Sequence, residues 1–453
     1  MLFLRPLRGA ACRRPAAPAA PAAARRYIQI ATTAGGSGCN VFTSGNVYLH
    51  PQWLRERCLS EKSVQEKTRQ PLRQPHEYAW PMVVSHAEFD GDARGLLLNV
   101  RFGDGHASTF VVADLEREAR SVTAHGIQQR DNQIPEAVLW RQEQPQRFKF
   151  NELVNEVKKV QTEEELGRNY FDHDKEHLIP ETNAGPMHAL TKRLMTHGHV
   201  VVTDVPGRDM MVADFAQALT RFQGYSSVRA TNWGPVFNVR SVPDKDLHDI
   251  AYTSLALPPH VDNPYRNPNP GFQLLHALEN KCILTGGSLA VDGFEVARQL
   301  RKEDPEMFRV LSEVPVRWEN NGGDGSTALV FFGPQISLNP SSGEVEQIRY
   351  SNKSGGYTPA ISDVDEMDLL FRARRRFAEL LNEESNTTTF RLQEGEIWMF
   401  NNLRVLHGRE AFDVQEGNRH FQGCYIDHDG VQTAYFRSKY LLQAEEEEEE
   451  KEV

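Results

Sequence analysis

Alternating apolar and polar positions mark the strands in the first half of the chain. The stretches LLLNVRF (residues 96–102) and STFVVADL (residues 108–115) alternate in this way, which predicts short strands with one buried face. Further along, KRLMTHGHVVVTDVPG (residues 192–207) changes at its central glycine from a mixed pattern to a VVV run. This change predicts a helix that ends at Gly198 and a buried strand that begins at His199.

Helical and extended patterns follow each other in the second half as well. Residues 293–314 predict helical turns that are interrupted at Pro305, because proline breaks the hydrogen-bond pattern of a helix. The stretch FRLQEGEIWMFNNLRVLHGRE (residues 390–410) predicts two strands, each followed by a turn. Residues 363–385 predict a strongly amphipathic helix, with inward positions at Met367, Leu370, Phe371, Phe377 and Leu381.

The composition indicates a large globular protein. The 453 residues are 39% hydrophobic and carry a net charge of −11, which predicts one large domain with a smaller companion. No apolar run approaches the length needed to cross a bilayer, so we expect no membrane partner. We also expect no nucleic-acid partner, because four basic residues on one helix of an acidic protein favour ion pairs and a solvated surface: Arg372, Arg374, Arg375 and Arg376.

Both ends of the chain differ in composition from the rest. The first 26 residues hold six arginines, and no acidic residue precedes Glu56. This bias predicts a disordered transit peptide over residues 1–36 and a mitochondrial matrix location, while a plain Ala/Pro-rich tail and a cytosolic protein are the alternative. The acidic residues 444–453 predict a disordered tail. Five scattered cysteines without a C-x-x-C pair favour reduced thiols: Cys12, Cys39, Cys58, Cys282 and Cys424.

A histidine and an aspartate stand two positions apart within residues 252–276. Side chains two apart on a strand share a face, so His260 and Asp262 can bind one ion together. The pair alone is a weak signal, because about one His-x-Asp arises by chance in a chain of this composition. His407, at the edge of residues 390–410, is the candidate third ligand. Two histidines and one carboxylate on one face of an ion are the arrangement that holds ferrous iron for oxygen chemistry.

The remaining positions on such an ion would take a chelating cosubstrate and dioxygen. If the cosubstrate is 2-oxoglutarate, its distal carboxylate needs a cation, and Arg419 lies twelve residues after His407. Arginine suits this role because its planar guanidinium forms two parallel hydrogen bonds with a carboxylate and stays charged. Thr285 or Ser288 can donate a hydroxyl group to the same carboxylate.

Other histidine pairs are weaker metal candidates. His197 and His199 form a rival pair, but a helix C-terminus favours histidine and the following strand is an ordinary buried run. Structural packing is therefore the better interpretation of this pair. His173 and His177 stand among charged residues and predict a solvated surface.

The candidate residues belong to an ordered set of motifs. The set comprises His260-Val261-Asp262, Thr285-Gly286-Gly287, Val291-Asp292-Gly293-Phe294, NLRVLHGR at residues 402–409, and Arg419-His420. From about residue 45 to residue 440, it resembles the gamma-butyrobetaine and trimethyllysine dioxygenases, which are iron and 2-oxoglutarate dependent hydroxylases of carnitine biosynthesis. The segment between the second and third motifs is one residue shorter than in the family, which leaves open whether Thr285 or Ser288 contacts the cosubstrate.

The resemblance implies a fold and a set of cofactors. The expected fold is mainly β with flanking helices, with a double-stranded β-helix (jelly-roll) catalytic domain at residues 145–440 and a small β-rich domain at residues 45–125. The expected cofactors and cosubstrates are Fe(II), 2-oxoglutarate and O2, with ascorbate as reductant. The family also suggests a homodimer.

Aromatic residues at family positions imply a cage for a trimethylammonium group: Trp233, Phe237, Tyr252 and Tyr425. The chemistry supports this, because a quaternary ammonium donates no conventional N–H hydrogen bond and aromatic faces attract it. Asp249 would attract an α-ammonium and repel a lone carboxylate, so it favours trimethyllysine over gamma-butyrobetaine, although it could equally be a turn residue. Asn352 could then hold the carboxylate of that substrate.

The resemblance also raises the question of a structural zinc. Some family members hold zinc in the small domain with three cysteines and one histidine. Here Cys58 and His106 match the ends of that motif, but the intervening cysteines are missing. Two ligands do not complete a tetrahedral site, so we predict no zinc.

These observations predict an enzyme that hydroxylates a trimethylammonium substrate, first of all trimethyllysine. Gamma-butyrobetaine or another trimethylammonium compound is the alternative substrate. A different class of protein, an inactive ligand-binding protein on the same barrel, is the alternative to an enzyme.

Overall fold

The computed structural model divides the chain into two compact units, Met1–Asp131 and Asn132–Val453, which we describe separately. The described residues are 28–33, 38–44, 47–65, 70–92, 95–121, 134–154, 183–220, 228–240, 253–281, 285–320, 329–340, 342–355, 363–413 and 417–452. Among their helices, none combines the length and the apolar character needed to span a membrane.

An antiparallel sheet organises the first unit. Its strands in spatial order are β1 (Gln29–Thr32), β2 (Cys39–Phe42), β4 (Val84–Asp92), β5 (Gly95–Phe102) and β6 (Ala107–Val111), with β3 (Tyr48–Leu49) paired to β2. The helical elements are α1 (Pro51–Glu56), η2 (Pro75–Glu77) and α2 (Val112–Ser121). Val41, Leu54 and Leu98 are fully buried, which places the core of this unit between the sheet and its helices.

The first unit departs from the sequence predictions at two places. Strand β5 confirms the prediction for residues 96–102, but β6 ends at Val111, and the strand predicted over residues 108–115 is wrong beyond that point. Val112 and Leu115 are both buried, and a spacing of three suits one face of helix α2. Disorder was predicted through residue 36, yet Ile28 is buried and β1 pairs with β2. Residues 1–27 lie outside the described residues.

Two sheets organise the second unit. The larger contains β10 (Val236–Arg240), β21 (Arg419–Ile426), β12 (Phe272–Asn280), β19 (Ile397–Asn401), β8 (His199–Thr203) and β7 (Gln146–Lys149), with β9 (Val228–Arg229) paired to β21. The smaller contains β11 (Leu257–His260), β20 (Val405–Arg409), β13 (Ser288–Asp292) and β18 (Thr387–Phe390). From β11 to β13, and again from β18 to β21, successive strands alternate between the sheets.

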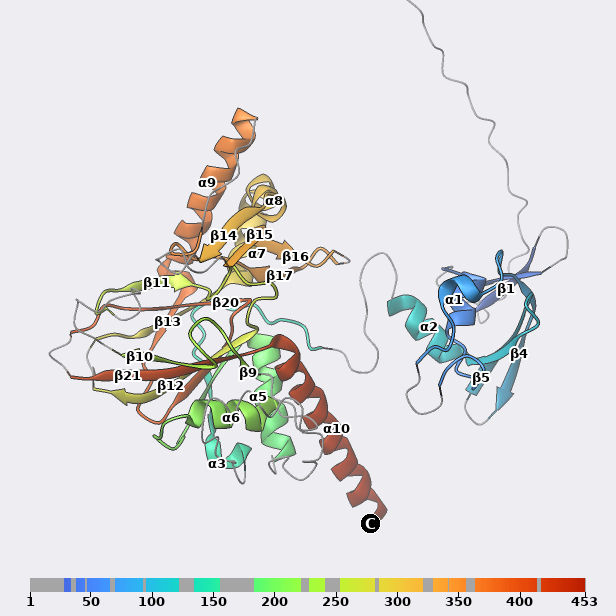
Figure 1. Ribbon diagram of the computed structural model, residues 1–453, viewed down its shortest axis with the longest axis horizontal. Helices are drawn as coiled ribbons and strands as arrows, with labels where there is room; N and C mark the ends of the chain where they lie inside the picture. The colour runs from blue at the N-terminus through green and yellow to red at the C-terminus, as the bar shows by residue number, and fades with distance from the viewer. Residues whose placement is uncertain are drawn as a thin grey trace, which may run out of the picture. The chain divides into compact units, whose positions relative to one another are not determined.

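Helices cover the outer faces of the two sheets (Figure 1). The larger sheet packs against α5 (Ala184–His197), α6 (Met211–Thr220) and α10 (His428–Glu452) through one apolar cluster. The smaller sheet packs against α7 (Gly293–Glu303), α8 (Pro305–Glu313) and α9 (Val364–Leu381) through another. A third cluster joins β8, β13 and β19 through Val201, Ala290 and Trp398, and so lies between the sheets. The mainly β fold with flanking helices is therefore confirmed.

Short elements complete the second unit. They are α3 (Phe150–Leu153), η5 (Glu384–Asn386), the pair β14 (Val316–Asn320) with β15 (Leu329–Gly333), and the pair β16 (Ile336–Leu338) with β17 (Val345–Ile348).

The helix boundaries predicted from glycine and proline are confirmed. Helix α5 ends at Gly198, whose φ of 83° is left-handed, and β8 begins at His199. Pro305 separates α7 from α8, and Asp304 caps α8 through hydrogen bonds from the backbone N–H groups of Glu306 and Met307. Proline and capping residues act locally, which is why these boundaries follow from sequence.

Helix α9 is amphipathic as predicted, with one exception. Leu370, Phe377 and Leu381 are buried, but Phe371 is 51% exposed, so its predicted inward position is wrong. The arginines of this helix form the predicted ion pairs: Arg372 with Asp368, Arg375 with Glu379, and Arg376 with Glu303.

Helix α10 continues through the acidic end of the chain. The disordered tail predicted over residues 444–453 is therefore wrong for residues 444–452, which are helical. Val431 and Ala434 anchor the start of the helix in the core. Glutamate is a good helix former, and extension of an anchored helix avoids the cost of nucleation.

Candidate metal centre

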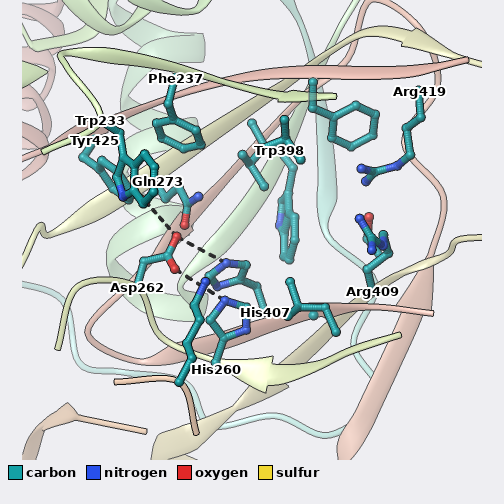
Figure 2. Close-up of a pocket in the computed structure, with 17 residues that line it drawn as sticks. Trp233, Phe237, His260, Asp262, Gln273, Trp398, His407, Arg409, Arg419 and Tyr425 are labelled. Atoms are coloured by element: carbon teal, nitrogen blue, oxygen red, sulfur yellow. Dashed lines mark hydrogen bonds and ion pairs between the residues drawn. The ribbon is translucent and has the colours of Figure 1, made fainter. Parts of the chain in front are cut away.

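Three potential metal ligands converge where the edge strand β11 of the smaller sheet pairs with β20. His260 ends β11 and lies opposite His407 of β20 in the antiparallel register. The His260 Nε2 atom is 3.4 Å from Asp262 Oδ1, and the His407 Nε2 atom is 3.6 Å from Asp262 Oδ2 (Figure 2). One ligand atom from each of the three residues lies within 4.8 Å of the other two, and among the described residues no other group of three or more His, Cys, Asp or Glu meets this geometry.

The protonation states of the site suit a divalent cation. Burial and the neighbouring His260 lower the pKa of His407 to about 3, so its imidazole is neutral at physiological pH. Burial opposes ionisation of Asp262, but His407 and His260 outweigh it and hold the pKa of this carboxyl below its usual range. A carboxylate and a neutral imidazole each offer a lone pair to a metal.

Hydrogen bonds fix the orientation of the candidate ligands. His260 Nδ1 is 3.0 Å from the carbonyl oxygen of Pro258, so Nδ1 donates and Nε2 is the ring nitrogen that faces Asp262. The Tyr425 hydroxyl donates to Asp262 Oδ2 at 2.7 Å. Asn402 holds the backbone on both sides: its Oδ1 accepts from Asp262 N–H at 2.8 Å, and its Nδ2 donates to Asp262 C=O at 3.0 Å. The three residues therefore fit a 2-His-1-carboxylate metal site.

Two arginines lie at one end of the pocket that contains this site (Figure 2). The guanidinium carbon of Arg419 lies 3.8 Å from the ring centroid of Phe421. The Nη2 atom of Arg409 donates to the carbonyl oxygens of Thr253 and Leu255, both at 2.7 Å. Sequence reasoning gave Arg419 a role and gave none to Arg409, although Arg409 is the last residue of the motif at residues 402–409.

The two candidate hydroxyl groups differ in position. Ser288 is buried and lines the pocket. The Thr285 hydroxyl oxygen accepts a hydrogen bond from the backbone N–H of Asp413 at 2.9 Å, and this residue is not among the described lining residues. The geometry thus favours Ser288 at the arginine end of the pocket.

Three aromatic side chains lie at the other end of the pocket (Figure 2). Phe237 and Tyr425 are stacked with their ring centroids 5.1 Å apart. Gly423 makes room for this arrangement, because a Cβ atom at that position would lie 2.4 Å from the Phe237 ring. Trp233 is 40% exposed and lies in the turn before β10. The structure therefore brings together three of the four predicted cage residues.

The other predicted substrate residues have different outcomes. Asp249 and the fourth cage residue, Tyr252, lie outside the described residues. Asn352 is exposed and is not among the described residues that line the pocket. Its neighbour Lys353 lines the pocket instead.

Sequence reasoning also missed two uncharged pocket residues. Gln273 is 2% exposed, and its Oε1 atom is buried without a hydrogen-bond partner. The signal was present, because Gln273 is a single polar residue in the apolar run that forms the start of β12. Trp398 separates the arginine end from the aromatic end (Figure 2) and gave no signal beyond its place in an apolar strand.

One of the two rival histidines, His199, has a packing role. His199 is fully buried, and its ring is stacked on Trp140 with centroids 4.6 Å apart. Burial, with Arg193 and Arg404 nearby, lowers the pKa of His199 to about 3. The structural interpretation of this residue is therefore the better one. His173 and His177 lie outside the described residues.

Cys58 and His106 approach each other in the first unit. The Cys58 Sγ atom lies 3.1 Å from His106 Nε2 and 3.2 Å from Ser60 Oγ. Burial opposes ionisation of the thiol, but Ser108, Ser60, Ser63 and His106 outweigh it and lower the pKa of Cys58 to about 6. Among the described residues, the groups around this pair are serine hydroxyls, whereas a structural zinc site is completed by further Cys or His ligands.

Comparison with known proteins identifies the family of the chain. The model of the "Taurine catabolism dioxygenase TauD, TfdA family" matches residues 158–425. A gamma-butyrobetaine dioxygenase of Pseudomonas sp. (strain AK-1) is 34% identical over 382 residues, which cover 84% of this chain and 88% of that protein. A dioxygenase of Strobilurus tenacellus is 29% identical and covers 90% and 88%. The mitochondrial trimethyllysine dioxygenase of Mus musculus is 32% identical over 257 residues, 55% of this chain and 57% of that protein.

These matches agree with the pocket, in which a His-Asp-His group, a pair of arginines and an aromatic end lie together. The chain therefore belongs to the TauD/TfdA dioxygenase family, among the relatives of the gamma-butyrobetaine and trimethyllysine dioxygenases, and is a 2-oxoglutarate-dependent dioxygenase.

Proposed function

We propose that this dioxygenase hydroxylates a trimethylammonium compound. The observation that carries the proposal is the order of groups in one pocket: arginines at one end, the His-Asp-His group in the middle and stacked aromatic rings at the other end (Figure 2). Such an order places a cosubstrate and a substrate on opposite sides of a metal.

Each group has a proposed role in the reaction. His260, Asp262 and His407 hold Fe(II), while Arg419 and Ser288 hold the distal carboxylate of 2-oxoglutarate. The bound iron supplies activation of O2, in which 2-oxoglutarate is converted to succinate and CO2 and the substrate gains a hydroxyl group. The chain orients the reactants, and the apolar side chains around the site exclude water. Ascorbate keeps the iron reduced.

The aromatic end supports a quaternary ammonium as the recognised group. A cation is attracted to the ring faces of Trp233, Phe237 and Tyr425. We propose Tyr252, which lies outside the described residues, as the fourth member of the cage. Trimethyllysine is the substrate that Asp249 favours, and gamma-butyrobetaine or another trimethylammonium compound is the alternative. The matched relatives include dioxygenases named for both substrates.

A coupled assay tests this function. Purified protein with ferrous iron, ascorbate and 2-oxoglutarate should release succinate and form an equal amount of hydroxylated product from a trimethylammonium substrate. The Asp262→Ala variant should lose this activity while its circular dichroism spectrum stays unchanged, because a metal ligand is lost and the fold is not. Wild-type protein that binds such compounds without iron-dependent succinate release would instead support the alternative of an inactive binding protein.

We also propose a setting for the enzyme. The two facing sheets with alternating strands support the jelly-roll, double-stranded β-helix assignment for the domain at residues 145–440. The arginine-rich N-terminus supports import into the mitochondrial matrix, which fractionation of tagged protein tests. A homodimer is proposed from the family resemblance, and light scattering tests it.

A further inference from the structure

Arg349 is a buried arginine that lies outside the catalytic pocket. It follows β17, is 4% exposed, and is not among the described residues that line that pocket. Its Nη1 atom donates to the Ser337 hydroxyl oxygen at 2.8 Å, and its guanidinium carbon lies 4.3 Å from the ring centroid of Phe331. Neither contact supplies a negative charge. No acidic side chain among the described residues forms an ion pair with Arg349, although buried charges are usually paired.

The β16–β17 pair has an apolar face and a polar face. Ile336 lies opposite Ile348 in the antiparallel register, and both are fully buried in the apolar cluster of the smaller sheet. Side chains alternate between the faces of a strand, so the neighbouring pairs in the register lie on the other face. The hydrogen bond from Arg349 N–H to the carbonyl oxygen of Gln335, at 2.8 Å, extends the register by one pair. The polar face therefore carries Gln335, Ser337, Gln347 and Arg349.

Several hydrogen-bond donors on this face are buried without a partner among the described residues. They include the Nε2 atom of Gln335, which is 2% exposed, the Nε2 atom of Gln347 and the Nε atom of Arg349. Ser351, two residues after Arg349, is 4% exposed, and its hydroxyl oxygen also lacks a partner. Buried polar groups in folded proteins are nearly always paired, because an unpaired one costs free energy. A cluster of unpaired donors therefore indicates a ligand that accepts hydrogen bonds.

The buried guanidinium keeps its charge. Burial lowers the pKa of Arg349 to about 10, and the charge of Glu346 opposes this effect. Glu346 is exposed and forms no ion pair with Arg349 in the described part of the chain. At neutral pH the polar face therefore combines a positive charge with unpaired donors, and none of its described residues is a carboxylate.

We propose that the polar face of β16 and β17 binds a small oxyanion, a phosphate or a carboxylate, through Arg349, Gln335 and Ser351. A guanidinium binds the oxygens of either ligand through charge-assisted hydrogen bonds, and the amide and hydroxyl groups add neutral ones. Burial of these three side chains limits the ligand to a small free ion. Ser337 and Gln347 are half-buried, which places the access to the site on their side. The site is separate from the metal and cosubstrate sites, so this proposal does not depend on the proposed function.

A bound anion would stabilise the second unit, because the segment around Arg349 is tied into its core. Tyr350 stands between Arg349 and Ser351, and its carbonyl oxygen accepts a hydrogen bond from Val261 N–H at 2.8 Å. The Tyr350 ring packs against Phe377 of α9 with the centroids 6.0 Å apart. A ligand that binds only the folded protein raises its free energy of unfolding, so thermal unfolding reports the binding.

Titration with phosphate and with acetate tests the proposal. The full-length protein is dialysed, and each anion is added at an ionic strength held constant with potassium chloride. One or both anions should raise the Tm of the wild type, and the anion that does so identifies the ligand as a phosphate or a carboxylate. In Arg349→Met, the dissociation constant of that anion, measured by calorimetry, should rise about 10- to 100-fold, the range for a lost charge-assisted hydrogen bond. In chloride alone, this variant should be at least as stable as the wild type, because it removes an unpaired buried charge.

A neutral substitution keeps the test independent of a folding defect in Arg349→Met. Gln335→Leu retains the charge and should weaken anion binding about 2- to 10-fold, the range for a neutral hydrogen bond. Arg375→Met removes an exposed arginine that pairs with Glu379 and should leave the anion affinity unchanged. Arg419→Met controls for an anion in the cosubstrate end of the catalytic pocket and should also leave it within about twofold, since separate sites act independently.

Three results overturn the proposal. The first is a wild type that responds to neither anion. The second is an anion affinity that is the same in the wild type and in Arg349→Met, or in Gln335→Leu where Arg349→Met does not fold. The third is a response that disappears in Arg419→Met and persists in Arg349→Met, because the anion then binds in the catalytic pocket.

Discussion

Arg419 and Arg409 lie at the same end of the pocket, and substitution of each in turn distinguishes the one that holds the cosubstrate. Arg409 already donates to two backbone carbonyl oxygens at 2.7 Å, and its guanidinium carbon lies 4.7 Å from the ring centroid of Phe412. Arg419 lies on the ring of Phe421, which fixes the plane of its guanidinium. We therefore expect Arg419→Met to weaken 2-oxoglutarate binding and Arg409→Met to destabilise the protein.

The size of the effect follows from the bonds that are lost. A guanidinium and a carboxylate form two charge-assisted hydrogen bonds, each worth about 1.5–3 kcal/mol. Loss of both should weaken 2-oxoglutarate binding by about 3–6 kcal/mol, which is about two to four decades in the dissociation constant. Arg409→Met should change that constant by less than about threefold, since its hydrogen bonds go to the protein backbone.

Anaerobic calorimetry with iron-loaded protein measures 2-oxoglutarate binding, and succinate release gives the corresponding KM. Thermal unfolding of both variants shows which of them loses stability. Arg409 rather than Arg419 would hold the cosubstrate if Arg409→Met weakens 2-oxoglutarate binding more than Arg419→Met does. Wild-type affinity for 2-oxoglutarate in Arg419→Met would likewise exclude Arg419 from this role.

Three further predictions concern stability, the aromatic end and the first unit. Asp292→Asn should lower the free energy of unfolding by about 3–5 kcal/mol in urea titrations, because it leaves the fully buried Arg404 without its carboxylate; an unchanged midpoint contradicts this. Gly423→Ala should raise KM for the trimethylammonium substrate, because the new methyl group displaces the ring of Phe237, while an equal rise in KM for 2-oxoglutarate would contradict this. Since the pKa of Cys58 falls from its ordinary 9.0 to about 6, its thiolate should stabilise the fold above pH 9 and lose this effect as pH falls to about 6. Comparison of the wild type with Cys58→Ser, by thiolate absorbance and by unfolding between pH 6 and 9, checks the last point, and identical pH profiles contradict it.

Part of the candidate metal centre was predictable because the spacing of His260 and Asp262 is local. His260 and Asp262 are only two residues apart, and Asp262 lies in the bend directly after β11, where its carboxylate still reaches His260. His407 lies in a strongly patterned strand, and the structure places it opposite His260. The ends of α5 and α7 were predictable for the same reason, since a glycine and a proline limit the backbone wherever they occur.

The pocket residues that sequence reasoning missed are brought together by distant pairings. Gln273 is opposite Tyr425 on one side and Phe400 on the other, so its place depends on the order of β21, β12 and β19. The segment that contains Lys353 is held at the pocket by the hydrogen bond between Val261 N–H and the carbonyl oxygen of Tyr350. This bond joins segments that are far apart in the chain. No spacing rule within one strand or turn contains such information.

The six residues from Asn402 to His407 show how one short segment builds the site. Asn402 is the first residue of the turn between β19 and β20, and its side chain forms hydrogen bonds with both the N–H and the carbonyl oxygen of Asp262. This turn residue therefore fixes the backbone position of one candidate ligand. Arg404, two residues later, pairs with Asp292 and donates to the carbonyl oxygen of Thr196, which anchors the turn to the start of α7 and the end of α5. The Arg404–Asp292 ion pair therefore stabilises the turn in addition to strand pairing. It also fixes the start of β20, the strand that contains His407. A change at Arg404 should accordingly disturb the metal centre through the backbone, although its side chain lies outside the pocket.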